Sequence, residues 1–169
     1  MKISVPAVSV DVFVRTFSNL SGLLDKGQAS ATARKFDPAV LVNARLAPDM
    51  HPLSRQVQLA CDIGKNGCAR LAGQTPPAFQ DTEQTLDELK ARIAKTVDYL
   101  NSIPGSAFEG AEDRDIKVPV GPETTLDFKG LQFLQTFLLP NVYFHATAAY
   151  LILRHNGVDI GKRDFLGPR

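Results

Sequence analysis

Apolar residues recur at intervals of three and four positions in three segments of the chain, 6–32, 52–72 and 82–102. This spacing places them on one face of an α-helix, so each segment is predicted to be a helix with one buried side. The buried positions are Phe13, Phe17, Leu20 and Leu24 in the first segment, Leu53, Val57, Cys61, Gly64, Cys68 and Leu71 in the second, and Leu86, Leu89, Ile93, Val97 and Leu100 in the third. A fourth helix is predicted over 129–155, with Gly157 as a suitable residue just beyond its end.

Four amphipathic helices bury their apolar faces best against one another. The pattern therefore predicts an all-α fold, a four-helix bundle that forms a single domain over residues 1–169. A small β-hairpin is predicted over 112–128, before the last helix, because apolar residues alternate there on either side of a Gly121-Pro122 turn. The alternating residues are Ile116, Val118 and Val120, then Thr124, Leu126 and Phe128.

Charged and polar residues mark the sides of the second and third helices that are expected to face water. They are Arg55, Gln58, Asp62 and Lys65 in the second helix, and Glu83, Asp87, Glu88, Lys90, Arg92 and Lys95 in the third. Asp81 and Gln84 resemble a capping box at the start of the third helix. Gly64 and Gly67 lower the helix propensity of the second, and we expect them to let a neighbouring helix approach closely.

Charge and cysteine usage exclude several classes of protein. A chain of 169 residues with a net charge of +1 gives no electrostatic basis for binding nucleic acid. Asp11 and Arg15 interrupt the N-terminal apolar run, which argues against a signal peptide or membrane span and predicts a cytoplasmic protein with no membrane partner. Cys61 and Cys68 lie two helical turns apart, roughly 10 Å, which is too far for a disulfide, and we expect both to be buried apolar residues.

Two of the three histidines, His145 and His155, lie in the last predicted helix. A helical projection places Asn141 and His145 on its buried side, directly after a kink expected at Pro140. His145 is therefore expected to point into the bundle, either as a hydrogen-bonded core residue or as a residue that binds a ligand. His155 falls in the final turn, where an imidazolium interacts well with the helix C-terminus, so we expect an end-of-helix or surface role.

His51 and Asp49 lie in the connection that precedes the second helix. Because Pro52 biases His51 away from helical geometry, the helical pattern does not fix the direction of its side chain. Asp49 is a candidate oxygen ligand or hydrogen-bond acceptor, and its alternative role is the N-cap of the second helix.

Several stretches of the chain resemble a known family. They are LVNARLAPDMHPLSRQVQLACD, ARLAG, AFEGAEDRDI and PNVYFHATAAYLILRHNGVDIGKRDFLG. The chain resembles, over nearly its whole length, a bacterial and fungal family of unknown function (domain of unknown function nineteen ninety-three). That family is similar to the DinB/YfiT-like superfamily of four-helix bundles. The resemblance implies a bundle in which three helices precede a hairpin and a last helix, and it also implies a homodimer.

The resemblance also implies a metal site. Metal-binding members of the superfamily use one histidine near the start of the second helix and two in an H-x-x-x-H pattern in the last helix, with nickel or zinc as the metal. On this chain His51 matches the first position approximately and His145 matches the last, whereas Asn141 occupies the middle position. An amide oxygen is a poor ligand for these metals, so we expect weak metal binding or none unless Asp49 supplies a carboxylate.

Two functions are compatible with this departure from the pattern. The first is a homodimeric binding or structural protein with a degenerate metal site, which still offers a place for a small-molecule ligand. The second is a divalent-metal-dependent enzyme, such as a thiol-dependent transferase, in which His51, Asn141 and His145 hold nickel or zinc. The sequence contains no Ser-His-Asp set, phosphate-binding glycine loop or HExxH motif that identifies catalytic residues.

Overall fold

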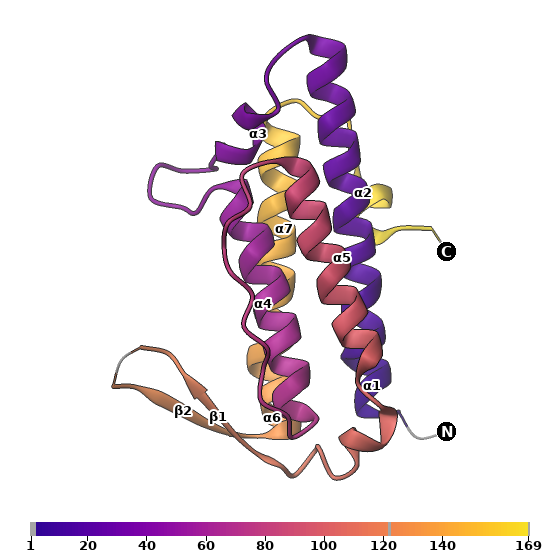
Figure 1. Ribbon diagram of the computed structural model, residues 1–169, viewed down its shortest axis with the longest axis vertical. Helices are drawn as coiled ribbons and strands as arrows, with labels where there is room; N and C mark the ends of the chain where they lie inside the picture. The colour runs from indigo at the N-terminus through magenta and orange to yellow at the C-terminus, as the bar shows by residue number, and fades with distance from the viewer. Residues whose placement is uncertain (1–2, 122, 169) are drawn as a thin grey trace.

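Four long helices lie side by side in the computed structural model, which describes residues 3–121 and 123–168 (Figure 1). They are α2 (Val10–Arg34), α4 (Leu53–Leu71), α5 (Leu86–Ser102) and α7 (Leu139–His155). Helices α2 and α7 run in one direction and α4 and α5 in the other, because the connection between α4 and α5 returns along the whole length of the bundle (Figure 1). The predicted four-helix bundle is confirmed.

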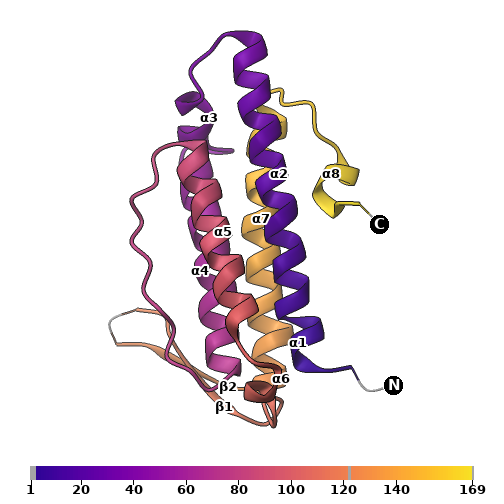
Figure 2. The same ribbon diagram turned by 45° about the vertical axis from the view of Figure 1, so that its right-hand side comes forward.

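Shorter elements close the ends and one side of the bundle. They are α1 (Val5–Val8), α3 (Ala39–Asn43), the 3₁₀ helix η1 (Gly105–Phe108), α6 (Gly130–Phe133), the π-helical segment η2 (Leu134–Leu138) and α8 (Lys162–Leu166). Helix α8 lies against α2 (Figure 2). Lys26 pairs with Asp164 at 2.6 Å, and Arg15 donates to the carbonyl of Leu166 at 3.1 Å, so the end of the chain is fastened to the bundle.

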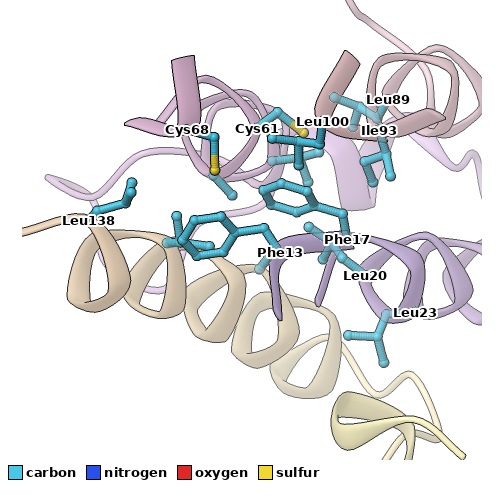
Figure 3. Close-up of a cluster of buried hydrophobic side chains, with 14 of the residues drawn as sticks. Phe13, Phe17, Leu20, Leu23, Cys61, Cys68, Leu89, Ile93, Leu100 and Leu138 are labelled. Carbon is cyan, nitrogen blue, oxygen red and sulfur yellow. The ribbon is translucent and has the colours of Figure 1, made fainter. Parts of the chain in front are cut away.

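The predicted apolar stripes meet in one core (Figure 3). The two glycines of α4 mark its closest approaches to other helices. A Cβ atom added to Gly64 would lie 2.7 Å from the ring of Phe17, and one added to Gly67 would overlap the side chain of Leu138. The expectation that these glycines allow close helix packing is confirmed.

Helix α5 begins four positions later than the sequence pattern indicates, at Leu86. Thr85 is its N-cap: the Thr85 hydroxyl accepts from the backbone N–H of Glu88 at 3.2 Å, and the Glu88 carboxylate accepts from that of Thr85 at 3.0 Å. The capping box expected at Asp81 and Gln84 is therefore wrong. The residues before Thr85 form part of an extended connection instead.

The predicted hairpin consists of β1 (Asp115–Pro119) and β2 (Thr125–Lys129), paired antiparallel with Ile116 opposite Phe128. It projects from one end of the bundle (Figures 1 and 2). Phe128 holds its base in place, since its ring centroid lies 5.8 Å from that of Phe133 and 5.5 Å from that of Phe137. Pro122 of the expected turn lies outside the described residues.

The last helix differs from a regular α-helix where the chain approaches Pro140. The backbone N–H of Leu139 bonds to the carbonyl of Leu134, five residues back, which defines the π-helical segment η2. Pro140 follows directly and has no N–H to offer the preceding turn, so the break occurs where a kink was expected.

A π-helical turn contains one extra residue, so the buried stripe changes phase beyond it. Leu134 and Leu138 are buried at the two ends of the segment, and in the next two turns Val142 and Ala146 are buried in place of Asn141 and His145. The buried residues of α7 are Val142, Ala146, Ala148, Ala149, Ile152 and Leu153. Asn141 and His145 lie at the edge of the buried stripe and are half-buried, so His145 faces the contact with α4 and not the centre of the bundle.

By length and composition, Gly130–His155 is the one helix among the described residues that could cross a membrane, with a mean hydropathy of 1.3. The buried helix of a bundle core meets the same criterion, so this is weak evidence for a membrane span. Only 39% of its most apolar stretch is buried within the chain, so much of this apolar helix lies on the surface.

Candidate functional site

His145 lies at the contact between α7 and α4, where it forms the centre of a short chain of hydrogen bonds. Its Nδ1 lies 2.8 Å from Oε1 of Gln56 on α4. Nε2 of the buried Gln56 in turn donates to the backbone carbonyl of His51 at 3.2 Å. Gln56 therefore connects the two histidines that the sequence selects as a pair.

The direction of these bonds fixes the tautomer of the neutral imidazole. A backbone carbonyl can only accept, so the Gln56 amide must present its nitrogen to His51 and its oxygen to His145. Nδ1 of His145 must then carry the hydrogen, which leaves the lone pair of Nε2 as the free acceptor of the neutral ring. A hydrogen bond of this kind at one ring nitrogen commonly orients a histidine whose other nitrogen binds a ligand.

The surroundings of His145 favour its neutral form. Burial lowers the pKa of His145 most, and the nearby positive charges of His51 and Arg55 lower it further. The ring of Phe144 meets the imidazole edge-on, with 5.2 Å between the ring centroids. His145 is thus a neutral proton acceptor beside an exposed aromatic ring.

We expect this lowered pKa to make folding stability depend on pH. As the pH falls through the ordinary histidine pKa of 6.5, the unfolded chain takes up a proton at His145 before the folded chain does. Stability therefore decreases from about pH 7 towards the lower folded pKa. Urea unfolding across this range should show a weaker pH dependence in His145→Gln than in the wild type. The matched variant at the exposed His155, His155→Gln, should keep the wild-type dependence, and equal slopes for both variants would contradict the assignment.

Asn141 lies one helical turn before His145, but its amide is engaged on its own helix. Its Nδ2 donates to the carbonyl of Phe137 at 2.6 Å, within the π-helical segment. Its amide nitrogen therefore bonds within its own helix, to the preceding turn. No ligand pattern in the sequence indicates this local bond.

The remaining candidates lie nearer the solvent. The side chains of His51 and Asp49 are exposed, and so is that of His155 in the last turn of α7. Helix α4 takes Pro52 as its N-cap with no side-chain bond, so the alternative role of Asp49 as that N-cap is wrong. Within the described residues, no three His, Cys, Asp or Glu side chains gather closely enough to hold a metal ion.

Sequence reasoning missed Gln56, although the sequence held a signal for it. Gln56 lies three residues after Leu53 and next to Val57, on the apolar side of α4. A polar residue inside an apolar stripe needs a buried partner, and the residues opposite it on another helix are the places to look for one.

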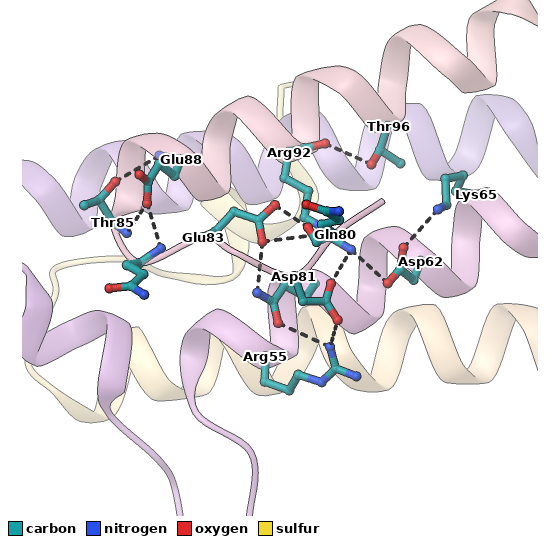
Figure 4. Close-up of polar contacts among 12 residues, drawn as sticks. Arg55, Asp62, Lys65, Gln80, Asp81, Glu83, Thr85, Glu88, Arg92 and Thr96 are labelled. Carbon is teal, nitrogen blue, oxygen red and sulfur yellow. Dashed lines mark hydrogen bonds and ion pairs between the residues drawn. The ribbon is translucent and has the colours of Figure 1, made fainter. Parts of the chain in front are cut away.

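A second polar cluster lies on the other side of α4, beneath the connection to α5 (Figure 4). The guanidinium of Arg92 is at its centre, with a side chain that is only 1% exposed. It lies 2.8 Å from Asp62, 2.8 Å from Asp81 and 3.0 Å from Glu83. Burial lowers the pKa of Arg92, but the hydrogen bond to Glu83 and the three negative charges outweigh it, so the net shift is upward.

Lys65 and Gln58 also belong to this cluster. The ammonium of Lys65 lies 3.1 Å from Asp62 and donates to the carbonyl of Pro77 at 2.5 Å. It also lies 3.9 Å from the ring centroid of Phe79. Gln58 donates to Glu83 at 2.9 Å. The expectation that Gln58, Lys65 and Arg92 face water is therefore wrong, because the connection between α4 and α5 covers them.

The charges of the cluster balance within it. Three cations, the third being Arg55 paired with Asp81, face the three carboxylates of Asp62, Asp81 and Glu83. A closed set of this kind leaves little net charge to attract a ligand. We therefore assign it the role of fixing the extended connection onto α4 and α5.

Cys61 and Cys68 are buried, as expected, and neither forms a disulfide. Burial raises the pKa of both thiols to about 12, although hydrogen bonds with Thr96 and Ser9 act in the opposite direction. A thiol with such a pKa is protonated at neutral pH, so neither residue is suited to act as a nucleophile or metal ligand.

Comparison with known proteins identifies the family of this chain. The model of the family described as Domain of unknown function (DUF1993) matches residues 7–166. The chain belongs to the DUF1993 family. Among solved structures, this DUF1993 chain is similar to the crystal structure of a DinB family member protein from Shewanella denitrificans, with 43% sequence identity and a TM-score of 0.89. The match covers 96% of this chain and 91% of that one, which supports the DinB-like assignment. No curated protein matches the chain.

Proposed function

We propose that this DinB-like protein is a homodimeric binding or structural protein whose histidine site is a degenerate metal site. The proposal rests on the series of hydrogen bonds that runs from His145 through Gln56 to the backbone carbonyl of His51. The amide of the neighbouring Asn141 is already bonded to its own helix. The bonds through Gln56 place the hydrogen on Nδ1, and burial and nearby positive charge favour the neutral ring, so Nε2 can accept a hydrogen bond from a small ligand.

The donor set does not fit a tight nickel or zinc site. Neutral imidazoles are good ligands for both metals, but the middle position holds an amide, and its nitrogen bonds to Phe137. His51 is exposed and contributes its backbone, not its ring, to the bond with Gln56. Asp49 is exposed as well. We therefore expect the wild-type chain to bind these metals weakly or not at all.

One observation favours the second candidate, a divalent-metal-dependent enzyme such as a thiol-dependent transferase. The Gln56 oxygen orients the imidazole of His145 in the way that hydrogen-bond acceptors behind metal-bound histidines orient those rings. In this alternative His51, Asn141 and His145 hold nickel or zinc.

We expect Asn141→His to convert weak nickel binding into tight binding. The substitution places two imidazoles one helical turn apart on the same side of α7, a spacing that suits a metal ion. Nickel titration of untagged protein by calorimetry should show at least about a tenfold gain in affinity over the wild type. A second substitution, His145→Ala, made in the Asn141→His background, should abolish the gain, whereas adding His155→Ala should not.

The outcomes separate the two candidates. Weak binding by the wild type and tight binding by Asn141→His support the degenerate site. Near-stoichiometric nickel or zinc in the untagged wild-type protein overturns it in favour of the metal-dependent enzyme. If Asn141→His gains no affinity, the three positions do not converge, and the assignment of this site fails.

A further inference from the structure

The outer side of α7 lacks charge, unlike the exposed sides of the other long helices. The sequence contains no Lys, Arg, Asp or Glu from Gly130 to Leu153. The exposed residues of α7 within that range, which we call the outer face of α7, are Pro140, Tyr143, Phe144, Thr147 and Leu151. Phe144 is 59% exposed, Leu151 43% and Tyr143 42%. Three large apolar side chains on one uncharged helix face are typical of a surface that contacts another molecule.

The outer face of α7 has a symmetric arrangement of side-chain sizes. Phe144 and Leu151 project from the same side of the helix, two turns apart, and the smaller Thr147 lies between them. A two-fold axis next to Thr147 would bring a second α7 alongside in the antiparallel direction. Phe144 would then lie beside the partner's Leu151, and the two copies of Thr147 would face each other.

We infer that the outer face of α7 binds a second copy of this chain as an antiparallel pair of helices. The charge pattern favours that occupant, because two copies of an uncharged face meet without removing any charge from water. The large-small-large arrangement also matches itself, and the small residue at the axis allows the helices to approach closely. The inference rests on the proposed homodimer and assigns its surface.

The pairing would also cover the exposed side of the candidate site. Phe144 packs edge-on against His145, so a partner helix lying on Phe144 extends the apolar surroundings of the imidazole. In this arrangement the second copy helps to shield His145 from water.

Sedimentation velocity over a range of concentrations tests the surface. Leu151→Glu should weaken dimerisation at least about tenfold, because it buries a carboxylate in the uncharged face. The matched control is Ala91→Glu, which adds the same charge to the exposed side of α5. Helix α7 packs against α2 and α4, so α5 lies across the bundle from it, and this variant should dimerise like the wild type. Circular dichroism should show both variants to be folded.

Disulfide trapping tests the register. Oxidised glutathione should link Thr147→Cys into covalent dimers, since the axis brings the two copies of that position together. Arg154→Cys should remain unlinked, because its two copies lie roughly 20 Å apart along the paired helices. The native Cys61 and Cys68 are buried, with pKa values of about 12, so they do not contribute to the product.

Three results would overturn the inference: a wild-type protein that stays monomeric, a Leu151→Glu variant that dimerises like the wild type, or cross-linking at Arg154→Cys but not at Thr147→Cys. Flotation of the monomer with phosphatidylcholine vesicles would assign the face to a membrane surface instead. The nickel titration of Asn141→His does not depend on dimerisation, so loss of the dimer alone leaves the proposed site intact.

Discussion

Replacing Arg92 with alanine is expected to destabilise the protein by about 3 kcal/mol, because removing one partner of a buried ionic network leaves the others without compensation. The guanidinium is almost fully buried and pairs with Asp62, Asp81 and Glu83. These carboxylates are partly exposed, and Lys65 and Arg55 remain to neutralise Asp62 and Asp81, so we expect the lower end of the range for buried pairs. Urea unfolding monitored by circular dichroism measures the effect as a lower midpoint.

Lys90→Ala on the same helix is the matched control. Lys90 pairs with Asp25 at 2.5 Å and with Asp87 at 3.5 Å, but its side chain and both carboxylates are accessible to water. Its loss should cost less than about 1 kcal/mol, as for other surface ion pairs. If Arg92→Ala cost no more than Lys90→Ala, the cluster would not be what fixes the connection onto α4 and α5.

The helices were predictable from the sequence because helical periodicity reports burial directly. Phe13, Phe17, Leu53 and Leu89 occupy the core as the spacing indicates. The hairpin was predictable for the same reason, since alternation is the signal of a strand. Each of these signals lies within a short window of sequence, and packing agrees with it.

The side of a helix that a long connection covers was not predictable in this way. Lys65 and Arg92 read as solvent-facing because charged residues are seldom fully buried unless they are paired. Two of their partners, Asp81 and Glu83, come from the connection before α5, and no helical pattern indicates where that extended segment lies.

The sequence pattern selected His51, Asn141 and His145 but did not give the orientation of their side chains. Gln56 connects two of these residues, since it accepts from His145 and donates to the backbone carbonyl of His51, and Asn141 lies one turn of α7 before His145. The projection that aimed Asn141 and His145 into the core assumed a regular α-helix. The π-helical segment Leu134–Leu138 adds a residue just before them, and both side chains lie at the edge of the buried stripe.

Gly130→Ala is expected to destabilise the protein by about 3 kcal/mol or more, since overpacking against backbone cannot be relieved by a rotamer change. Gly130 begins α6, and a Cβ atom there would overlap the backbone carbonyl oxygen of Ala111. Relief requires α6 to move away from the segment before the hairpin, which would break the bond from the N–H of Leu131 to the carbonyl of Glu112, now 2.9 Å long. The control is Gly22→Ala in α2, where an added Cβ meets nothing within 4 Å and should stabilise the helix by roughly 0.5–1 kcal/mol. The midpoints of thermal unfolding of the two variants should therefore shift in opposite directions from that of the wild type. A Gly130→Ala variant as stable as Gly22→Ala would show that Gly130 is not close-packed against the carbonyl of Ala111.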